Sequence, residues 1–352
     1  MRIGIAGLHS VYWPRAFADS ARRIAGVDLR AAATAGRNAE EIKHSLGLSP
    51  EEFANQFGVA IYDDPVEMAR KERLDAAFIT AEHSRMVEIV EALAPLGVHL
   101  YIAKPMGNNM ERARRIVEVC KQSGIIAATG STMRFDAGLR VAHQQIAAGK
   151  IGNVLCVRVM HQHGEITGFP PEDWYWHPEE GGPELSLGWY VLDAIRWLAG
   201  SEPVRIYAEY ENFITADSPF MDNGKILSRL ANGAIASADI YFSTRWPFPR
   251  WEIEVVGSSG AVKTMQTGYE GMLFNKEGVH AFQHNMNDMV LAEISDWVEA
   301  CRQGRPPEVP VDDALRTLAA CFASRDSART QMPVTIGDAH LGQAVGGSLH
   351  SG

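Results

Sequence analysis

The chain has 352 residues, of which 46% are hydrophobic and 22% are charged. This composition is that of a globular protein, and the length predicts about two domains. Acidic residues outnumber basic ones by 43 to 33, and the net charge of −10 argues against partners such as nucleic acid or an anionic membrane. The sequence has no apolar run long enough to span a membrane and no signal-peptide layout. We therefore expect a cytoplasmic protein.

The first part of the sequence alternates short apolar strands with helices. We predict strands at Arg2–Ala6, Leu29–Ala35, Ala60–Tyr62, Ala76–Thr80, His99–Ile102 and Ile125–Thr129. The helices between them are expected at Pro14–Ile24, Glu51–Phe57, Pro65–Lys71, Met86–Leu96 and Met110–Ser123. Strands that are apolar throughout predict a parallel sheet covered by helices on both faces. The fold class of this part is α/β, and it is expected to end near residue 128.

The pattern changes in the second part, which predicts an α+β domain at residues 129–338 and a tail at 339–352. Strands are expected at Val154–His163 and repeatedly between Val204 and Met265, with turns at Asn-Gly and Ser-Gly pairs. Helices are expected at Asp136–Ala148, Leu187–Leu198, Asn285–Gln303 and Val311–Thr330. The sheet of this part is predicted to be mostly antiparallel.

The turn after the first strand is a candidate nucleotide site. A dinucleotide fingerprint, GxGxxG, uses glycines for a tight turn, for close approach of the pyrophosphate and for helix packing. Only Gly7 survives here, and His9 and Tyr12 replace the other glycines. Gly7, Leu8, His9 and Ser10 are the candidate cofactor-binding residues. A glycine turn that binds no nucleotide is the alternative.

The end of the second strand bears on the kind of cofactor. An acidic residue there would bind the ribose hydroxyls of NAD, but the sequence reads Ala35-Gly36-Arg37. Because a guanidinium pairs well with a phosphate, Arg37 favours NADP over NAD if a nucleotide binds. An ordinary surface arginine is the alternative.

A lysine follows the fifth strand, in the segment Tyr101–Gly107. The carboxyl end of a parallel strand faces the crevice in which α/β proteins bind ligands, so Lys104 is expected there. Pro105 favours an extended Lys104. A surface lysine before a turn is the alternative.

With these residues the chain resembles the Gfo/Idh/MocA oxidoreductase family over nearly its whole length. The family's E-K-P motif here reads Ala103-Lys104-Pro105. Other segments that match family motifs in order are Asp75–Thr80 with Glu82-His83, Arg134-Phe135, Ile151–Val154, Gly181–Asp193, Val255–Gly260, Glu293–Ala300 and Gly304–Pro307. The resemblance implies an N-terminal Rossmann domain with a doubly wound parallel sheet. It also implies a C-terminal α+β domain with a large open sheet that forms a homodimer or homotetramer.

The resemblance also assigns residues to a cofactor, NADP or NAD, and to a sugar or polyol substrate. The implied cofactor contacts beyond the first turn are Arg37, Thr80, Glu82, His83, Lys104, Pro105 and Arg134. The family places an Asp and a His one helical turn apart, but here Ser186 and Tyr190 stand in those positions, while Asp193 is retained. Some family members use a tyrosine in place of the histidine, so Tyr190 is a candidate acid or base. A tyrosine packed in a helix is the alternative.

We predict that Lys104 orients and polarises the reacting oxygen and that Tyr190 exchanges the proton. The Lys104 ammonium is expected to lower the pKa of Tyr190, because a nearby positive charge favours the phenolate. Acid–base assistance of this kind is typically worth about 10²–10⁴-fold. Asp193 is a further catalytic candidate.

Residues before the middle helix are candidates for the substrate pocket. His161 and His163 are two positions apart on a predicted strand, so both face one side. With Ser186 and the aromatic run around Trp176 they form the predicted substrate wall. A sheet face without a role is the alternative for the histidines, and a core or subunit interface is the alternative for the aromatic run. No metal is expected, because no further ligand has suitable spacing and the four cysteines are far apart.

The sequence therefore predicts an NAD(P)-dependent oxidoreductase that acts on a hydroxyl or keto carbon of a sugar, polyol or related cyclic compound. The first alternative is a redox-neutral enzyme that cleaves glycosides through a transient keto sugar with a retained cofactor. The second alternative is a relative that binds a ligand without catalysis. The lost glycines and the missing Asp–His pair favour this alternative.

Overall fold

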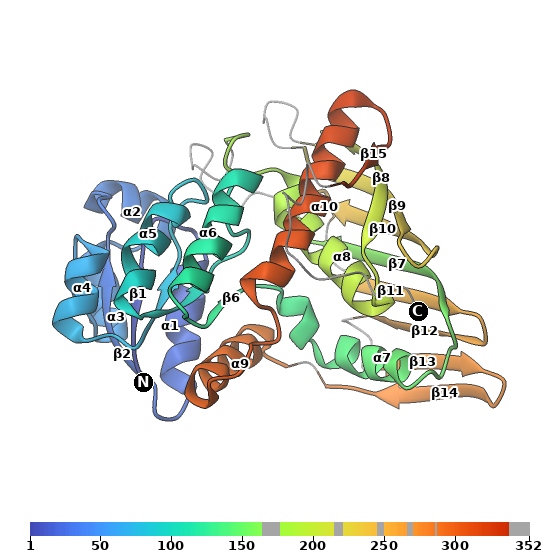
Figure 1. Cartoon of the computed structure of the whole chain (residues 1–352), viewed down its shortest axis with the longest axis horizontal. Coiled ribbons are helices and arrows are strands. Elements are labelled where there is room, and N and C mark those ends of the chain that lie inside the picture. Colours follow the sequence, from blue (N-terminus) through green and yellow to red (C-terminus); the bar gives the residue numbers. More distant parts are fainter. Residues whose placement is uncertain (164–176, 215–220, 245–249, 266–269, 286, 338–352) are drawn as a thin grey trace.

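The computed structural model describes residues 1–163, 177–214, 221–244, 250–265, 270–285 and 287–337. The described chain is built on a 6-stranded sheet and a 9-stranded sheet that lie in separate halves of the molecule (Figure 1). The predicted position of Trp176 and the predicted tail at 339–352 lie outside the described residues.

The six-stranded sheet is parallel and has the order β3-β2-β1-β4-β5-β6. This is the strand order of a doubly wound Rossmann sheet. In such a sheet the order in which strands are added reverses between β1 and β4, and ligands bind at the carboxyl ends of the strands at this point. The predicted fold class is thus confirmed. The strands are Arg2–Ala6 (β1), Asp28–Ala33 (β2), Ala60–Tyr62 (β3), Ala76–Ile79 (β4), His99–Ile102 (β5) and Ala127–Thr129 (β6).

Helices cover this sheet (Figure 1). They are Trp13–Arg23 (α1), Ala39–Leu46 (α2), Pro50–Phe57 (α3), Pro65–Glu72 (α4), Met86–Leu93 (α5), the 3₁₀ turn Ala94–Leu96 (η1) and Met110–Gln122 (α6). Helix α2 was absent from the sequence prediction. It is held at its start by a reciprocal capping box between Asn38 and Glu41, and Gly47 ends it in the left-handed conformation. Both signals are readable in the sequence.

The nine-stranded sheet has the order β14-β13-β12-β11-β7-β10-β9-β8-β15. Strands β10 and β7 run parallel, and the other described neighbours are antiparallel. The mostly antiparallel sheet is therefore confirmed. Its strands are Val154–Gln162 (β7), Pro203–Glu211 (β8), Asn223–Leu230 (β9), Ile235–Tyr241 (β10), Trp251–Gly257 (β11), Gly260–Met265 (β12), Glu270–Asn275 (β13), Gly278–Gln283 (β14) and Val334–Thr335 (β15). Strands β13, β14 and β15 were not predicted.

Helices lie over one face of this second sheet (Figure 1). They are Ala137–Ala147 (α7), Pro183–Ala199 (α8) and Val311–Thr330 (α10), and the 3₁₀ turn Thr132–Phe135 (η2) precedes α7. Helix α8 begins at Pro183, earlier than predicted, because a proline suits the first turn of a helix. This extension brings the segment that starts at Gly181 alongside the first domain.

Helix α9, Met289–Gln303, lies between the two halves of the molecule (Figure 1). Trp297 of this helix contacts the rings of Phe78 and Tyr101 from the first sheet. Arg23 of α1 forms an ion pair with Asp288 at 2.5 Å. The chain therefore returns to the first domain after completing the second sheet, and α9 fixes one side of the space between them.

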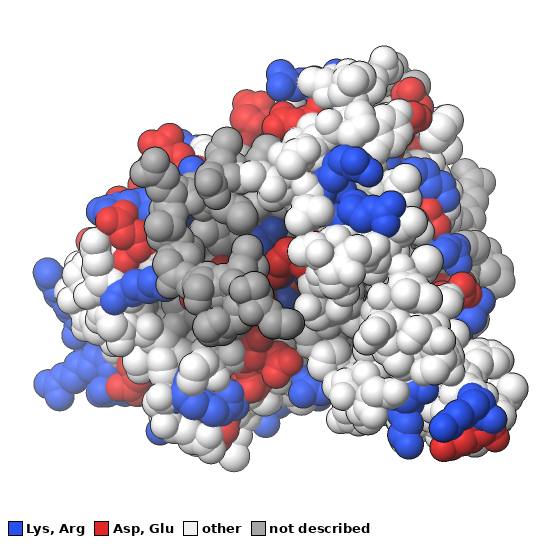
Figure 2. Space-filling view, turned by 45° about the vertical axis from the view of Figure 1, so that its right-hand side comes forward, with Lys and Arg blue, Asp and Glu red and all other residues white. Residues whose placement is uncertain are grey.

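The surface in Figure 2 carries Lys and Arg side chains interspersed with Asp and Glu side chains. No helix among the described residues is both long and apolar enough to cross a membrane.

Candidate active site

A cleft of about 870 Å³ lies where the first sheet meets the helix-covered side of the second. The residues that line it are Ser10, Val11, Tyr12, Trp13, His83, Lys104, Pro105, His161, His163, Gly181, Gly182, Leu185, Ser186, Leu187, Tyr190, Phe242 and Arg250. They come from the carboxyl ends of β1, β4 and β5, from α8 and from the second sheet. The cleft therefore lies at the position where doubly wound sheets bind ligands.

The β1–α1 turn fits a dinucleotide despite its missing glycines. Gly7 has a φ of 99°, and a Cβ atom at this residue would lie 2.7 Å from the backbone nitrogen of Ala81. Thr80 donates its hydroxyl hydrogen bond to the carbonyl of Gly7. Helix α1 begins without a side-chain cap, which leaves its first N–H groups suited to bind phosphate. Of the other turn residues, Ser10 lines the cleft and Leu8 is buried in the core.

Lys104 stands at the end of β5 with only 8% of its surface exposed. Its amine donates a hydrogen bond to the backbone oxygen of Ser186 at 3.1 Å and lies 4.4 Å from the centre of the Tyr190 ring. Burial and the positive charge of Arg250 lower the pKa of Lys104 to about 7. The lysine can therefore be neutral or charged near physiological pH.

Tyr190 and His161 lie against each other beneath this amine. Their rings are stacked at 5.3 Å with an angle of 12° between the planes. Burial raises the pKa of Tyr190 above its ordinary value. This corrects the expectation that Lys104 lowers it: desolvation dominates, and the amine lies over the face of the ring. The structure favours a protonated phenol beside an amine that titrates easily.

The predicted histidine pair lines the cleft from one strand. His161 is buried, and desolvation lowers its pKa well below the ordinary value, so it is neutral. His163 contacts the Phe242 ring at 6.0 Å. Within the described ranges, no group of three or more His, Cys, Asp or Glu residues is arranged to hold a metal ion.

A second hollow lies on the other side of the β1–α1 turn. It is lined by His9, Arg37, Glu40, Glu41, His44, Ser45, Glu82, Ser84, His177 and Glu180. Arg37 contacts Glu82 at 2.5 Å and Glu41 at 3.2 Å. Burial alone would raise the pKa of Glu82, but the hydrogen bond from His9 and the charge of Arg37 help to lower it to about 2. Arg37 is thus paired with two carboxylates in this structure.

The turn after β4 is joined to the segment that precedes α8. His83 Nδ1 lies 2.5 Å from the carbonyl oxygen of Glu180, and the backbone nitrogen of Ser84 donates to the Glu180 carboxylate at 2.9 Å. Burial lowers the pKa of His83 to about 4, so this ring is neutral. These contacts hold the cofactor side of the cleft against the helix that carries Ser186 and Tyr190.

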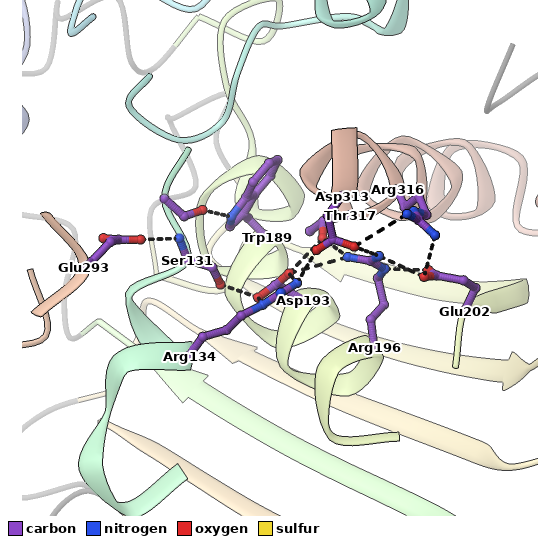
Figure 3. Close-up of polar contacts among 11 residues, drawn as sticks. Ser131, Arg134, Trp189, Asp193, Arg196, Glu202, Glu293, Asp313, Arg316 and Thr317 are labelled. Atoms are coloured by element: carbon purple, nitrogen blue, oxygen red, sulfur yellow. Dashed lines mark hydrogen bonds and ion pairs between the residues drawn. The ribbon is translucent and has the colours of Figure 1, made fainter. Parts of the chain in front are cut away.

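Asp193 and Arg134 are not among the described residues that line the cleft, and Figure 3 shows them in a network of buried polar contacts. Both are buried and form a bidentate pair, with N···O distances of 2.7 and 2.6 Å. Asp313 contacts Arg134 at 2.7 Å and Arg196 at 2.9 Å. Fully paired charges of this kind suit a structural role, and neither side chain is free to meet a substrate or cofactor.

Two groups in or behind the cleft were not among the predicted site residues. Arg250 lines the cleft, and no motif in the sequence points to it. Glu293 of α9 is buried behind the cleft, where it accepts a hydrogen bond from the backbone nitrogen of Ser131 at 2.6 Å (Figure 3). Burial raises the pKa of Glu293 to about 8. Glu293 opens a family-like segment, but only the fold places it near Lys104.

The fold and the cleft define an oxidoreductase that binds a dinucleotide. Residues 3–131 match the model of an oxidoreductase family with an NAD-binding Rossmann fold, and residues 139–263 match that of the GFO/IDH/MocA C-terminal domain. The chain belongs to the Gfo/Idh/MocA family of NAD(P)-dependent oxidoreductases, as its sequence predicts.

Relatives and solved structures share most of the chain's length. The chain is 24% identical to scyllo-inositol 2-dehydrogenase (NAD(+)) of Bacillus subtilis over 81% of this chain and 85% of that protein. It is 23% identical to myo-inositol 2-dehydrogenase of Thermotoga maritima, over 96% and 98% of the two chains. An Agrobacterium radiobacter oxidoreductase, solved with NAD+, L-tartaric acid and magnesium, superposes with a TM-score of 0.83 at 18% identity and covers 96% of this chain and 99% of its own.

Proposed function

We propose that the protein is a dehydrogenase that oxidises a secondary hydroxyl group of a sugar, a polyol or a related hydroxy compound, with NAD as its cofactor. The observation that carries this proposal is the buried Lys104 amine, which faces Tyr190 in a cleft bounded by the start of α1. The names of the inositol dehydrogenases among the relatives agree with this substrate class.

The residues of the cleft divide the chemistry between them. The nicotinamide of bound NAD supplies the hydride acceptor. The neutral Lys104 amine accepts the proton of the substrate hydroxyl and becomes an ammonium group, while the hydride of the same carbon would go to the bound cofactor. The protonated Tyr190 phenol donates a hydrogen bond that holds the oxygen in place. This assignment reverses the predicted one, because the low pKa belongs to Lys104 and not to Tyr190.

NAD is a better fit than NADP at the second hollow. Arg37 is paired with Glu41 and Glu82, and Glu40 and Glu180 add further acidic groups to the same lining. A 2′-phosphate would meet this negative charge, whereas ribose hydroxyls can donate hydrogen bonds to carboxylates. We therefore expect a higher kcat/KM with NAD+ than with NADP+.

The outer face of the second sheet supports the expected homodimer or homotetramer. Ile235, Cys156 and Val256 are neighbours across three strands, and Leu227 lies on the same face. The side chains of Leu227, Ile235 and Val256 are all exposed. A second copy of the chain packed against this face would bury them.

The test is to follow absorbance at 340 nm with NAD+ and a panel of sugars and polyols. Net formation of NADH supports a dehydrogenase. Release of an aglycone from a glycoside without net NADH would instead support the redox-neutral alternative. The absence of saturable binding of both NADH and NADPH, measured by fluorescence, would favour the non-catalytic alternative.

A further inference from the structure

The cleft is lined by basic side chains and by no acidic ones among the described residues. Lys104 and Arg250 line it together with His83, His161 and His163, and its described lining includes no Asp or Glu. The second hollow, in contrast, is lined by four glutamates, Glu40, Glu41, Glu82 and Glu180. The contrast matters because the chain as a whole carries a net charge of −10.

The two basic side chains of the cleft, Lys104 and Arg250, have no carboxylate hydrogen-bond or ion-pair partner within the part of the chain that the structure describes. The hydrogen bond of Lys104 goes to a neutral backbone oxygen, that of Ser186. The acidic residues that flank Gly181 and Gly182 are occupied elsewhere: Glu180 accepts from the backbone of Ser84, and Glu184 forms an ion pair with Arg325. Their charges do not compensate the cleft.

Arg250 is held beside the predicted substrate wall. Its backbone oxygen accepts a hydrogen bond from the nitrogen of Gln162, between His161 and His163, at 2.8 Å. Its positive charge also contributes to the lowered pKa values of Lys104 and His161. The guanidinium and the amine therefore act on the same space.

The hydrogen-bonding chemistry of these groups restricts the ligand. The Arg250 guanidinium donates hydrogen bonds and accepts none, whereas a neutral polyol presents hydroxyl groups that also need acceptors. An anionic oxygen accepts only, and its hydrogen bonds to a cation are short and strong. A ligand with an anionic group satisfies Arg250 better than a neutral polyol does.

We infer that the substrate is a hydroxy compound with an anionic group, a sugar acid or a sugar phosphate, whose anion binds at Arg250 while the reacting hydroxyl lies at Lys104. This inference rests on the proposed function and names its substrate class. A carboxylate and a phosphate share the chemistry that Arg250 recognises, so the experiment must separate them.

The experiment compares matched pairs that differ in the charged group, with NAD+ and detection at 340 nm. The pairs are D-gluconate with D-glucitol, D-galactonate with galactitol, D-glucuronate with D-glucose, and D-glucose 6-phosphate with D-glucose. We expect kcat/KM to be at least about tenfold higher for the anionic member of at least one pair, because charge-assisted bonds exceed neutral ones. A higher kcat/KM for one of the sugar acids identifies a carboxylate as the group that binds at Arg250, and a higher kcat/KM for the sugar phosphate identifies a phosphate.

The variant Arg250→Gln should lower kcat/KM for the preferred anion by about tenfold or more while changing that of its neutral partner only a few-fold. Arg250→Lys, which keeps the charge, should recover part of the loss. Arg70→Gln, on the exposed surface of α4, is the control and should change neither. Equal losses for both members of the pair would show that Arg250 acts on the structure and not on the anion.

Two results overturn the inference, and they can be told apart from failure of the proposed function. If neutral polyols are oxidised as well as or better than their anionic partners, the substrate class is wrong and the dehydrogenase stands. If no compound reduces NAD+, the proposed function fails. Binding of the same pairs to the NAD-loaded protein, measured by calorimetry, then decides the inference, and equal affinities would refute it.

Discussion

At the scale of single residues, the environment of Lys104 determines what it can do. A lysine in water is charged at neutral pH, but burial beside the Tyr190 ring and the charge of Arg250 bring its pKa to about 7. A general base works best when its pKa is close to the working pH. In the proposed mechanism, the neutral amine is therefore the group that receives the substrate proton.

Replacement of Lys104 by methionine should lower kcat by at least about 10²-fold while the affinity for NADH changes only a few-fold. In the unmodified enzyme, kcat/KM should fall below a pH of about 7 as the amine becomes protonated. The variant should lose this dependence. Lys150→Met, at an exposed position, is the control, and near-normal turnover of Lys104→Met would remove the lysine from the mechanism.

Tyr190→Phe should cost less than the loss of the lysine, roughly tenfold in kcat, because it removes one hydrogen bond from a phenol that remains protonated. The measurement is steady-state turnover at a saturating cofactor concentration. A decrease in kcat as large as that of Lys104→Met would indicate that Tyr190, and not Lys104, transfers the proton.

Glu293 should make the stability of the protein depend on pH. Its folded-state pKa of about 8 exceeds the ordinary value of 4.5, so the folded state holds a proton that the unfolded state has already released. The contribution of Glu293 to stability is therefore present below the unfolded pKa and is lost as the pH rises toward 8. Between these values the slope is at most about 1.4 kcal/mol per pH unit.

Urea unfolding at pH 5 and pH 7 tests this expectation. Between pH 5 and pH 7, the free energy of unfolding of Glu293→Gln should fall less than that of the unmodified protein. The reason is that glutamine does not titrate, so this position no longer releases a proton on unfolding. Glu299→Gln is the control and should follow the unmodified protein, because this residue lies on the same helix with its side chain 46% exposed. Parallel curves for all three proteins would show that Glu293 has an ordinary pKa.

At the scale of elements, helix α2 sets the charge around Arg37. Glu41 is the third residue of the helix, where it completes the capping box with Asn38 and also pairs with Arg37. One carboxylate therefore stabilises the start of the helix and neutralises the guanidinium. In our proposal, the nucleotide preference thus depends on an element that the sequence prediction missed.

Glu41→Gln should raise the ratio of kcat/KM for NADP+ to that for NAD+ several-fold, because it removes one of the two carboxylates paired with Arg37 and a glutamine can still form the capping box. Glu52→Gln is a matched control, since Glu52 has the same position in the capping box of α3 and lies outside both hollows. An unchanged ratio would show that Arg37 does not meet the adenosine ribose.

The elements that the sequence predicted correctly are those with a strong local pattern. The apolar strands β1 to β6 and the long helices α9 and α10 were placed within a few residues. Strand β14 was missed because almost all its residues are exposed, which removes the alternation that marks a strand. Arg250 was missed because its place depends on a backbone contact with Gln162, which is far away in the sequence.

At the scale of the whole molecule, the open sheet should determine the oligomeric state. The double variant Ile235→Asp with Val256→Asp places charges at exposed positions of β10 and β11, on either side of β7, and should convert a dimer or tetramer to smaller species. Light scattering after gel filtration measures the mass. Leu96→Asp, at an exposed apolar position of the first domain, is the control. A monomeric unmodified protein would refute the expected assembly.

The charge network of Arg134, Asp193, Arg196 and Asp313 affects how a mutational scan should be interpreted. Removal of one member leaves its oppositely charged partner without full compensation in the interior, at a typical cost of about 3–5 kcal/mol. Substitutions at Asp193 would then lower activity in cells by lowering the yield of folded protein, whatever the residue contributes to the reaction. A screen that scores growth alone would mistake this loss for a missing catalyst.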